Sequence, residues 1–346
     1  MLTRALATFV VVLLALGVAP TTGDAQAPIK IGVIQPLSGP VAASGNYVRM
    51  GAEIARDWLN AHGGVNGRKI ELVIEDNKSD PKEAASAASV TKRGNPWVFR
   101  ISPPSEMEAL GLEQYIDKLG VKKADFLAVN TDWGRGAIQA FGDMLKKRGV
   151  QVGVSEFMEQ SATDMNAQLT KIKGTGGDTL FLTTAVEQIT LVLRQGQEQR
   201  LQRKVITTGG SSSPTQLIKQ AGAAAEGSYH IVFFMPWFPE AMPDGKLAKA
   251  FVEEWNKRGH PFEGLTEGFR GHDGIATIAE AVKLAGKDEP KAIRDALWKV
   301  SFTGVNGPIK FDKDGPAGKE SGQSKPSIFV VQVRDGKVAL PDFLKK

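Results

Sequence analysis

Short apolar runs alternate with segments of helical periodicity along most of the chain. Apolar runs or alternating positions that stop near Gly, Pro, Ser or Asn predict strands at residues 29–34, 69–75, 97–101, 126–130, 179–183, 204–208 and 228–235. Apolar positions three or four residues apart predict helices at residues 45–61, 81–90, 106–119, 135–148, 164–173, 186–195, 214–220, 247–257, 266–284 and 290–300. This alternation is typical of an α/β fold with parallel sheets.

The end of the chain follows a different pattern. Residues 327–333 and 337–340 are apolar runs that flank Asp335 and Gly336. Asp-Gly is a preferred dipeptide of two-residue hairpin turns, so this segment is predicted to be a β-hairpin.

Residues 1–27 have the pattern of a secretory signal peptide. Arg4 precedes an apolar stretch over residues 5–19, and Ala25-Gln26-Ala27 has the small-x-small form of a cleavage site. The stretch is shorter than the roughly 20 residues that span a bilayer. We expect cleavage after Ala27 and, without a Cys for a lipid anchor at that junction, a mature protein free in the periplasm.

Composition narrows the class of protein. A chain of 346 residues is expected to form two lobes, each with its own core. It has 43 Lys and Arg against 38 Asp and Glu, a net charge of +5, and these residues are mixed along the chain, so nucleic acid is not an expected partner. The absence of Cys excludes disulfides, thiol catalysis and Cys-ligated metals.

The sequence carries no catalytic or metal motif that we can identify. Residues 174–177 (GTGG) lack the Lys-Ser/Thr of a phosphate-binding loop, and the four His residues stand far apart. Ser211, Ser212 and Ser213 are better explained as the cap of a helix beginning at Pro214 than as a nucleophile cluster. We therefore predict that the protein is not an enzyme and uses no cofactor or metal.

Four loops join a predicted strand to the following helix. They cover residues 38–45, 130–134, 183–185 and 208–211, and they are rich in Gly, Ser and Thr. In parallel α/β sheets, such loops meet at the carboxyl edge of the strands, where ligands bind. Backbone amides, small hydroxyls and helix N-termini there suit an anionic or zwitterionic small molecule. Each loop by itself is better explained as an ordinary turn.

Several segments resemble one family closely. They are residues 29–40 (IKIGVIQPLSGP) with Gly45, 63–70 (GGVNGRKI) with Glu75-Asp76, 94–100 (GNPWVFR), 163–169 (TDMNAQL), 272–274 (HDG) and 302–308 (FTGVNGP). The sequence thereby resembles the branched-chain amino-acid-binding (leucine/isoleucine/valine-binding) proteins of periplasmic ABC importers.

The resemblance implies two doubly wound parallel-sheet lobes of the type I periplasmic binding fold, joined by three crossovers near Arg100, Met235 and Asn306. After the signal peptide (1–27), the first lobe would comprise residues 28–101 and 237–306, and the second 102–236 and 307–346. It further implies a monomer that captures a small molecule in the interlobe cleft by hinge closure and docks on the importer's membrane permease.

Several ligand positions implied by the resemblance depart from the family's residues. The aromatic before Gly45 is replaced by Ser44, whereas the aromatic of the second lobe is kept as Trp133. No carboxylate stands near Gly210 and Ser211 to meet an ammonium. After Thr184, itself a candidate ligand residue, Ala185 or Val186 stands where an aromatic is expected, and His272, which could donate to a carboxylate, replaces a tyrosine. The pattern favours an aromatic or other carboxylate, or a polar amide, over leucine.

One departure is larger. Residues 88–93 (ASVTKR) run directly into Gly94, where the family has a strand–helix–strand unit. The first lobe is therefore expected to lack a unit on the order of 30–50 residues, through a natural deletion or a defective gene model.

Three functional interpretations follow. The favoured one is the solute-binding component of an importer; the alternatives are a periplasmic ligand sensor that acts on a membrane receptor, or a degenerate protein that no longer binds because of the deletion.

Overall fold

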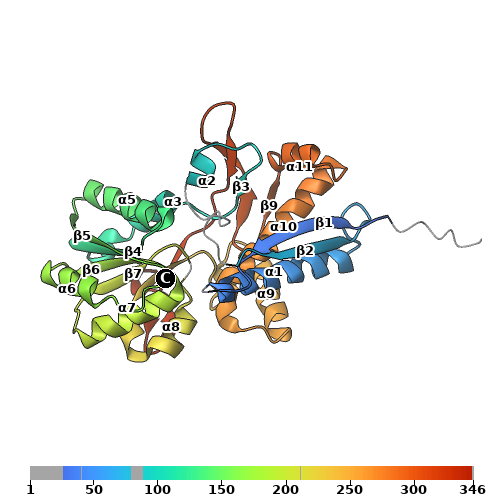
Figure 1. The fold of residues 1–346 in the computed structure, drawn as a ribbon. Helices are drawn as coiled ribbons and strands as arrows, with labels where there is room; N and C mark the ends of the chain where they lie inside the picture. The colour runs from blue at the N-terminus through green and yellow to red at the C-terminus, as the bar shows by residue number, and fades with distance from the viewer. Residues whose placement is uncertain (1–25, 40, 79–88, 211, 345–346) are drawn as a thin grey trace, which may run out of the picture.

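The computed structural model describes residues 26–39, 41–78, 89–210 and 212–344. Two α/β bodies lie side by side, one around a seven-stranded sheet and the other around a two-stranded sheet (Figure 1). Most of the predicted signal peptide and of the predicted helix at 81–90 lies outside the described residues.

The larger body is built on the sheet of order β14-β13-β8-β7-β6-β4-β5. The strands from β5 to β8 are mutually parallel, and β13 joins β8 and β14 in antiparallel pairs. Its strands are β4 (Lys123–Val129), β5 (Gln151–Met158), β6 (Thr179–Thr183), β7 (Lys204–Thr207), β8 (Tyr229–Val232), β13 (Phe329–Arg334) and β14 (Lys337–Ala339). Its helices are α3 (Ser105–Glu113), α4 (Ile116–Leu119), α5 (Asp132–Lys147), α6 (Asn166–Gly174), α7 (Val186–Glu198) and α8 (Pro214–Ala221).

Helices cover both faces of this sheet. Phe126 of β4 and Phe181 of β6 are buried with residues of α3 and α5, whereas the adjacent Leu127 and Leu180 are buried with residues of α6, α7 and α8. Successive residues of a strand point to opposite faces, so each of these strands serves two helical layers.

The smaller body is built around the parallel pair β1 (Ile29–Gln35) and β2 (Ile70–Asp76). Ile29, Ile31 and Val33 point to one face, where α1 (Ala42–Ala61) and α10 (Leu265–Ala285) bury them. The other face, which carries Ile34 and Val73, is exposed.

The remaining elements are distributed over both bodies. They are α2 (Ser89–Lys92), β3 (Phe99–Arg100), α9 (Gly245–Lys257), α11 (Pro290–Leu297), β9 (Ser301–Thr303), β10 (Pro308–Lys310), β11 (Asp312–Asp314) and β12 (Ser321–Gln323), with 3-10 turns at Gly222–Ala225, Pro239–Ala241, Phe262–Gly264 and Asp342–Leu344. β12 pairs with β3 in parallel and with β11 in an antiparallel arrangement.

Three chain segments pass between the two bodies. They follow β3, follow β8 and precede β13. Asn306 ties the second and third of these segments together, because its amide donates to the carbonyls of Phe233 and Ser327 and its carbonyl accepts from the Ser327 amide at 3.1 Å. Residues 308–323, assigned from sequence to the second lobe, contribute Ile309 and Phe311 to a cluster with residues of α10 and α11.

Most predicted elements are present, with three kinds of difference. The helix predicted at 106–119 is divided into α3 and α4, and the strand predicted at 97–101 is reduced to β3. The strand β5 and the short strands β9 to β12 were not predicted. The α/β class with parallel sheets and the hairpin at Asp335-Gly336 are confirmed; both turn residues have positive φ, 52° and 66°.

Candidate ligand-binding cleft

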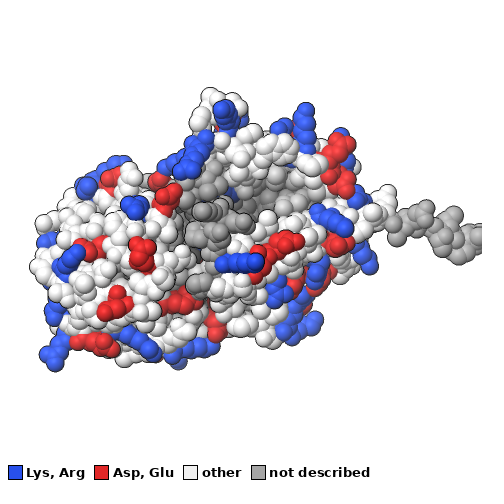
Figure 2. Space-filling view, in the orientation of Figure 1, with Lys and Arg blue, Asp and Glu red and all other residues white. Residues whose placement is uncertain are grey.

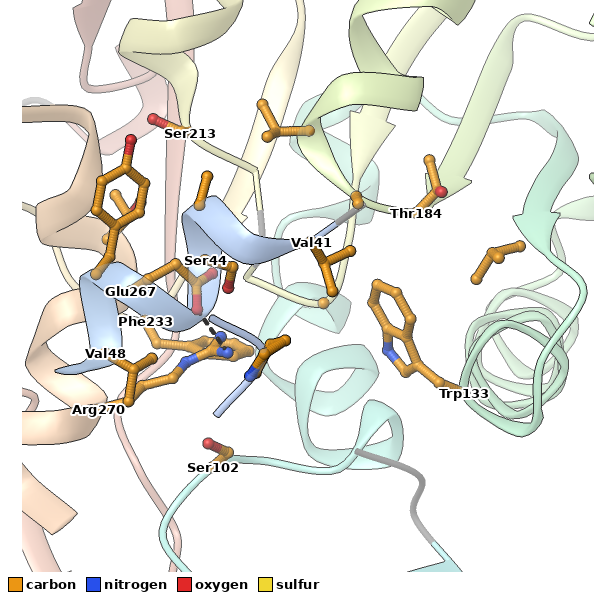
Figure 3. A pocket seen from close by; sticks show the side chains of 18 of the residues that line it. Val41, Ser44, Val48, Ser102, Trp133, Thr184, Ser213, Phe233, Glu267 and Arg270 are labelled. Atoms are coloured by element: carbon orange, nitrogen blue, oxygen red, sulfur yellow. Dashed lines mark ion pairs between the residues drawn. The ribbon is translucent and has the colours of Figure 1, made fainter. Parts of the chain in front are cut away.

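A cavity of about 790 Å³ lies between the two bodies, at the carboxyl ends of strands β1, β4, β6 and β7. All four loops singled out in the sequence contribute to its lining. Figure 3 shows Glu267, Arg270 and Ser44 on one side of the cavity and Trp133 and Thr184 on the other. A ligand there would touch both bodies at once.

The loop after β1 is fixed by the end of β2. Asp76 Oδ1 accepts hydrogen bonds from the backbone amides of Leu37, at 2.8 Å, and Ser38, at 3.2 Å. Hydrogen bonds from Ser38 and Lys78 hold the pKa of this exposed carboxyl well below its usual range, at about 2. Asp76 therefore positions the loop that leads to Ser44, and Ser44 itself lines the cavity.

Trp133 lies in the first turn of α5. Thr131 caps this helix by accepting a hydrogen bond from the Gly134 amide at 3.3 Å. The indole packs against the backbone of Gly209, where a Cβ atom would stand 2.1 Å from ring carbon Cζ2 and where φ is 87°. Only glycine combines this backbone conformation with room for the ring. The indole presents an apolar surface to the cavity.

Of the other ligand residues predicted from sequence, the structure places some in the cavity lining and others outside it. Thr184 and Ala185 line the cavity, and the Thr184 hydroxyl donates to Gln188. Gly45 and Gly210 do not line it, since they pack against Pro36 and the Phe233 ring, respectively. Ser211 lies outside the described residues.

His272 is also outside the lining. Its ring packs on Phe251, with centroids 5.1 Å apart, and its Nδ1 lies 3.1 Å from Asp273. Asp273 in turn accepts hydrogen bonds from the amides of Val305 and Asn306. His272 therefore neighbours the crossover segments.

Carboxyl groups are the feature of the cleft that sequence reasoning missed. Five line the cavity: Glu108, Asp132, Glu187, Glu263 and Glu267. They come from α3, α5, α7 and the start of α10 with the turn before it. The available signal was Glu267 and Arg270, two opposite charges three residues apart in a helix segment that is otherwise mostly buried.

Glu108 and Glu267 are both buried. Glu108 Oε2 accepts a hydrogen bond from the Gly209 amide at 2.6 Å, yet burial raises the pKa of Glu108 to about 7. Burial also raises the pKa of Glu267, against the opposing charge of Arg270 and the nearby Ser44. Burying a carboxylate is costly unless charge and hydrogen bonds compensate it, and here one guanidinium serves two carboxyl groups.

The two guanidinium groups of the cleft have partners within the chain. Arg270 Nη1 lies 2.9 Å from Glu267 Oε2, and the guanidinium stands over the Phe233 ring at 5.4 Å. Arg100 donates to Gln323 at 2.7 Å and to Thr91 at 3.2 Å. Neither group is therefore an unoccupied anion site.

Among the residues that the structure describes, no group of three or more His, Cys, Asp or Glu could hold a metal ion. Within the same ranges, no helix combines the length and apolar character needed to cross a bilayer. Basic and acidic side chains are interspersed over the face shown in Figure 2.

Comparison with known proteins identifies the family. The model of the periplasmic binding protein family matches residues 28–91 and 87–337, which is most of the chain. The chain belongs to the periplasmic binding protein family. This family comprises non-enzymatic substrate-binding proteins of ABC transporters, as the lack of catalytic motifs predicted.

Individual relatives have low sequence identity to this chain. An amino acid binding protein of Pseudomonas aeruginosa is 26% identical over 355 aligned positions, which cover 88% of this chain and 92% of the relative. A branched-chain amino acid transporter substrate-binding protein of Streptococcus pneumoniae, solved with isoleucine, is 22% identical with a TM-score of 0.75, over 90% of this chain and 97% of that one. A solute-binding protein of R. palustris, solved with benzoate, is 18% identical with a TM-score of 0.75, over 90% and 95%. The solved structures confirm the type I periplasmic binding fold.

Proposed function

We propose that this chain is the solute-binding component of an ABC importer and captures a small amino-acid-like or carboxylate ligand by closing its two lobes. The supporting observation is the cavity, because residues from both bodies line it at the carboxyl ends of their strands. Relatives of the same fold bind isoleucine or benzoate. Trp133, Ser44, Thr184 and Ala185 would contact the ligand.

Hinge closure is the mechanism that this arrangement favours. A ligand that contacts both lobes binds the closed form better than the open form, and it shifts the equilibrium by that difference in affinity. The three crossover segments, two of which Asn306 joins, would serve as the hinge. The closed form would then dock on a membrane permease, after export directed by residues 1–27 with cleavage after Ala27.

The first lobe in this proposal lacks a strand–helix–strand unit. Within the described residues β1 pairs only with β2, and one face of this pair exposes Ile34 at 60% and Val73 at 39%. Parallel sheets are normally covered on both faces. The alignment with the Pseudomonas relative also exceeds the length of this chain: 88% of 346 residues is about 304, so about 50 of the 355 positions are gaps on this chain's side.

A degenerate protein that no longer binds is the second candidate, and the incomplete coverage of β1 and β2 favours it. One experiment separates the two. Purified residues 28–346 are melted alone and with amino acids, amides and aromatic acids.

At 100 times its dissociation constant, a ligand adds about 2.7 kcal/mol of stability. For a chain of this size this raises the melting temperature by about 5–10 °C. If the chain is an importer component, at least one compound should raise the melting temperature by this amount. The rise should be smaller in the Trp133→Ala variant. A cooperative melt that no compound shifts would instead support the degenerate protein.

A further inference from the structure

The cleft contains more acidic than basic groups, and the carboxyl groups come from both bodies. Glu187 stands at the first turn of α7 in the larger body, and Glu267 stands near the start of α10 in the smaller body. Their charges reach each other, since Glu187 contributes to the raised pKa of Glu267. Glu187 and Glu263 likewise both raise the pKa of Tyr47, which lies on the α1 side of the cavity. Glu187 and Glu267 therefore interact electrostatically across the cavity, and Glu263, which also lines it, acts with Glu187 on Tyr47.

Glu267 is the group that distinguishes this cluster from an ordinary acidic surface. Its exposed fraction is 6%, and its carboxyl oxygens have no well-aligned hydrogen-bond donor, although the Ser44 hydroxyl is near enough to lower its pKa. Its close contact is the ion pair with Arg270 of the next helical turn. A buried carboxylate with so little hydrogen bonding leaves an acceptor for a donor that enters the cavity.

The balance of charge argues against an anion at this place. Five carboxyl groups and two guanidinium groups line the cavity, and both guanidinium groups are engaged by side chains of the protein. Glu108 adds a second carboxyl group close to Arg270. A carboxylate ligand would have to displace these partners and face the remaining acidic groups, whereas a cation would relieve their repulsion.

We propose that the cleft recognises a cationic group of its ligand, an ammonium or a guanidinium, which Glu267 and Glu187 hold between the two bodies. The aromatic surface of Trp133 would receive the apolar part of the ligand. This proposal rests on the proposed function and specifies its ligand: amines and amino acids bind, and plain carboxylic acids do not. Because the two carboxyl groups belong to different bodies, the cation itself would favour the closed form.

The test uses compounds that share a carbon skeleton and differ in charge. Titration calorimetry on residues 28–346 compares phenylalanine with phenethylamine, which lacks the carboxylate, and with 3-phenylpropionate, which lacks the ammonium. Leucine, 3-methylbutylamine and 4-methylpentanoate form a second set. We expect the amine of at least one set to bind at least about tenfold more tightly than its acid, as one lost hydrogen bond to a charged group is worth about 1.5–3 kcal/mol. Acids that bind as tightly as their amines would overturn the proposal.

Two variants assign the effect to residues. Glu187→Gln changes an exposed side chain, so folding is preserved, and amine binding should weaken about tenfold while acid binding does not weaken. Glu198→Gln, at the exposed far end of the same helix, is the matched control and should leave both unchanged. Equal amine affinities in the Glu187→Gln and Glu198→Gln variants would contradict the role of Glu187. If no compound binds to a protein that still melts cooperatively, the proposed function fails, and this inference fails with it.

Discussion

Glu108 is almost completely buried, with an exposed fraction of 2%. Burial raises the pKa of its carboxyl group to about 7. In the unfolded chain the same group titrates near 4.5. The folded protein therefore holds a proton more tightly, and folding stability falls as the pH rises from about 4.5 to about 7. The full effect of a shift of this size is about 3 kcal/mol, since one pKa unit corresponds to about 1.4 kcal/mol.

Glu108→Gln should remove this pH dependence. The amide oxygen of Gln can still accept the hydrogen bond from the Gly209 amide but cannot ionise. Urea unfolding at pH 4.5 and pH 8 should show the variant becoming more stable than the parent at the higher pH only. Glu113→Gln, at the other end of α3, is the control. The same pH profile in the parent and in Glu108→Gln would show that Glu108 is not the titrating group.

At the scale of single residues, the sequence identified those cavity residues that follow a recognisable strand. Trp133 and Ser44 lie in the first turns of helices that follow strands, and both line the cavity. Glu187 and Glu267 were missed because they stand far apart in the chain and meet only when the two bodies face each other. An isolated Glu on a helix carries no sign of its partner across a cleft.

Glycines decide how closely α1 and α10 approach. A Cβ atom at Gly51 would lie 1.8 Å from the carbonyl oxygen of Gly268, and one at Gly271 would lie 1.9 Å from that of Val48. The backbones are in contact at these positions, so any side chain would have to push the helices apart. This contact also places Glu267 and Arg270 at the cavity, because they belong to the same turns of α10.

Gly271→Ala should therefore destabilise the protein by about 2 kcal/mol or more, which is typical of overpacking in a close contact. Gly274→Ala lies on the same helix with open space around the added methyl group, and it should stabilise the protein by up to about 1 kcal/mol through helix propensity. Chemical denaturation of the two variants measures both changes. Equal stabilities would mean that the helices separate without cost.

Helices were predicted more reliably than strands. The long amphipathic helices α5, α7 and α9 were found from their apolar period. β5 was missed because its residues are mostly half-buried at the sheet edge, and its sequence QVGVSEFM mixes polar and apolar positions. The short strands β9 to β12 have three residues each, too few for a period to appear.

Closure of the two bodies is a property of the whole molecule. A compact chain of this length has a radius of gyration of about 20 Å. If ligand closes the cleft, small-angle X-ray scattering should show the radius falling toward this value when a binding compound is added. Trp133→Ala should show the smaller radius only at higher ligand concentration. If the compound binds but the radius of gyration is unchanged at saturation, hinge closure is contradicted.

The general architecture was predictable because strand–helix alternation permits few arrangements. The placement of residues 308–323 was not, since it depends on Phe99 packing against both Phe311 and Trp298, which lie far from it in the sequence. The carboxyl-lined cavity was likewise inaccessible, because it exists only between two bodies whose relative position no local pattern describes.

The order of strands in the large sheet has a consequence for how the protein is made. β13 pairs with β8, yet residues 329–334 are synthesised after β8 and after all the elements from α9 to β12 that lie between them in the chain. Until they emerge, β8 remains an open edge and its partner is absent. A nascent chain therefore cannot complete this sheet until β13 has been made. A chain truncated before Phe329 would keep that open edge and be prone to aggregate.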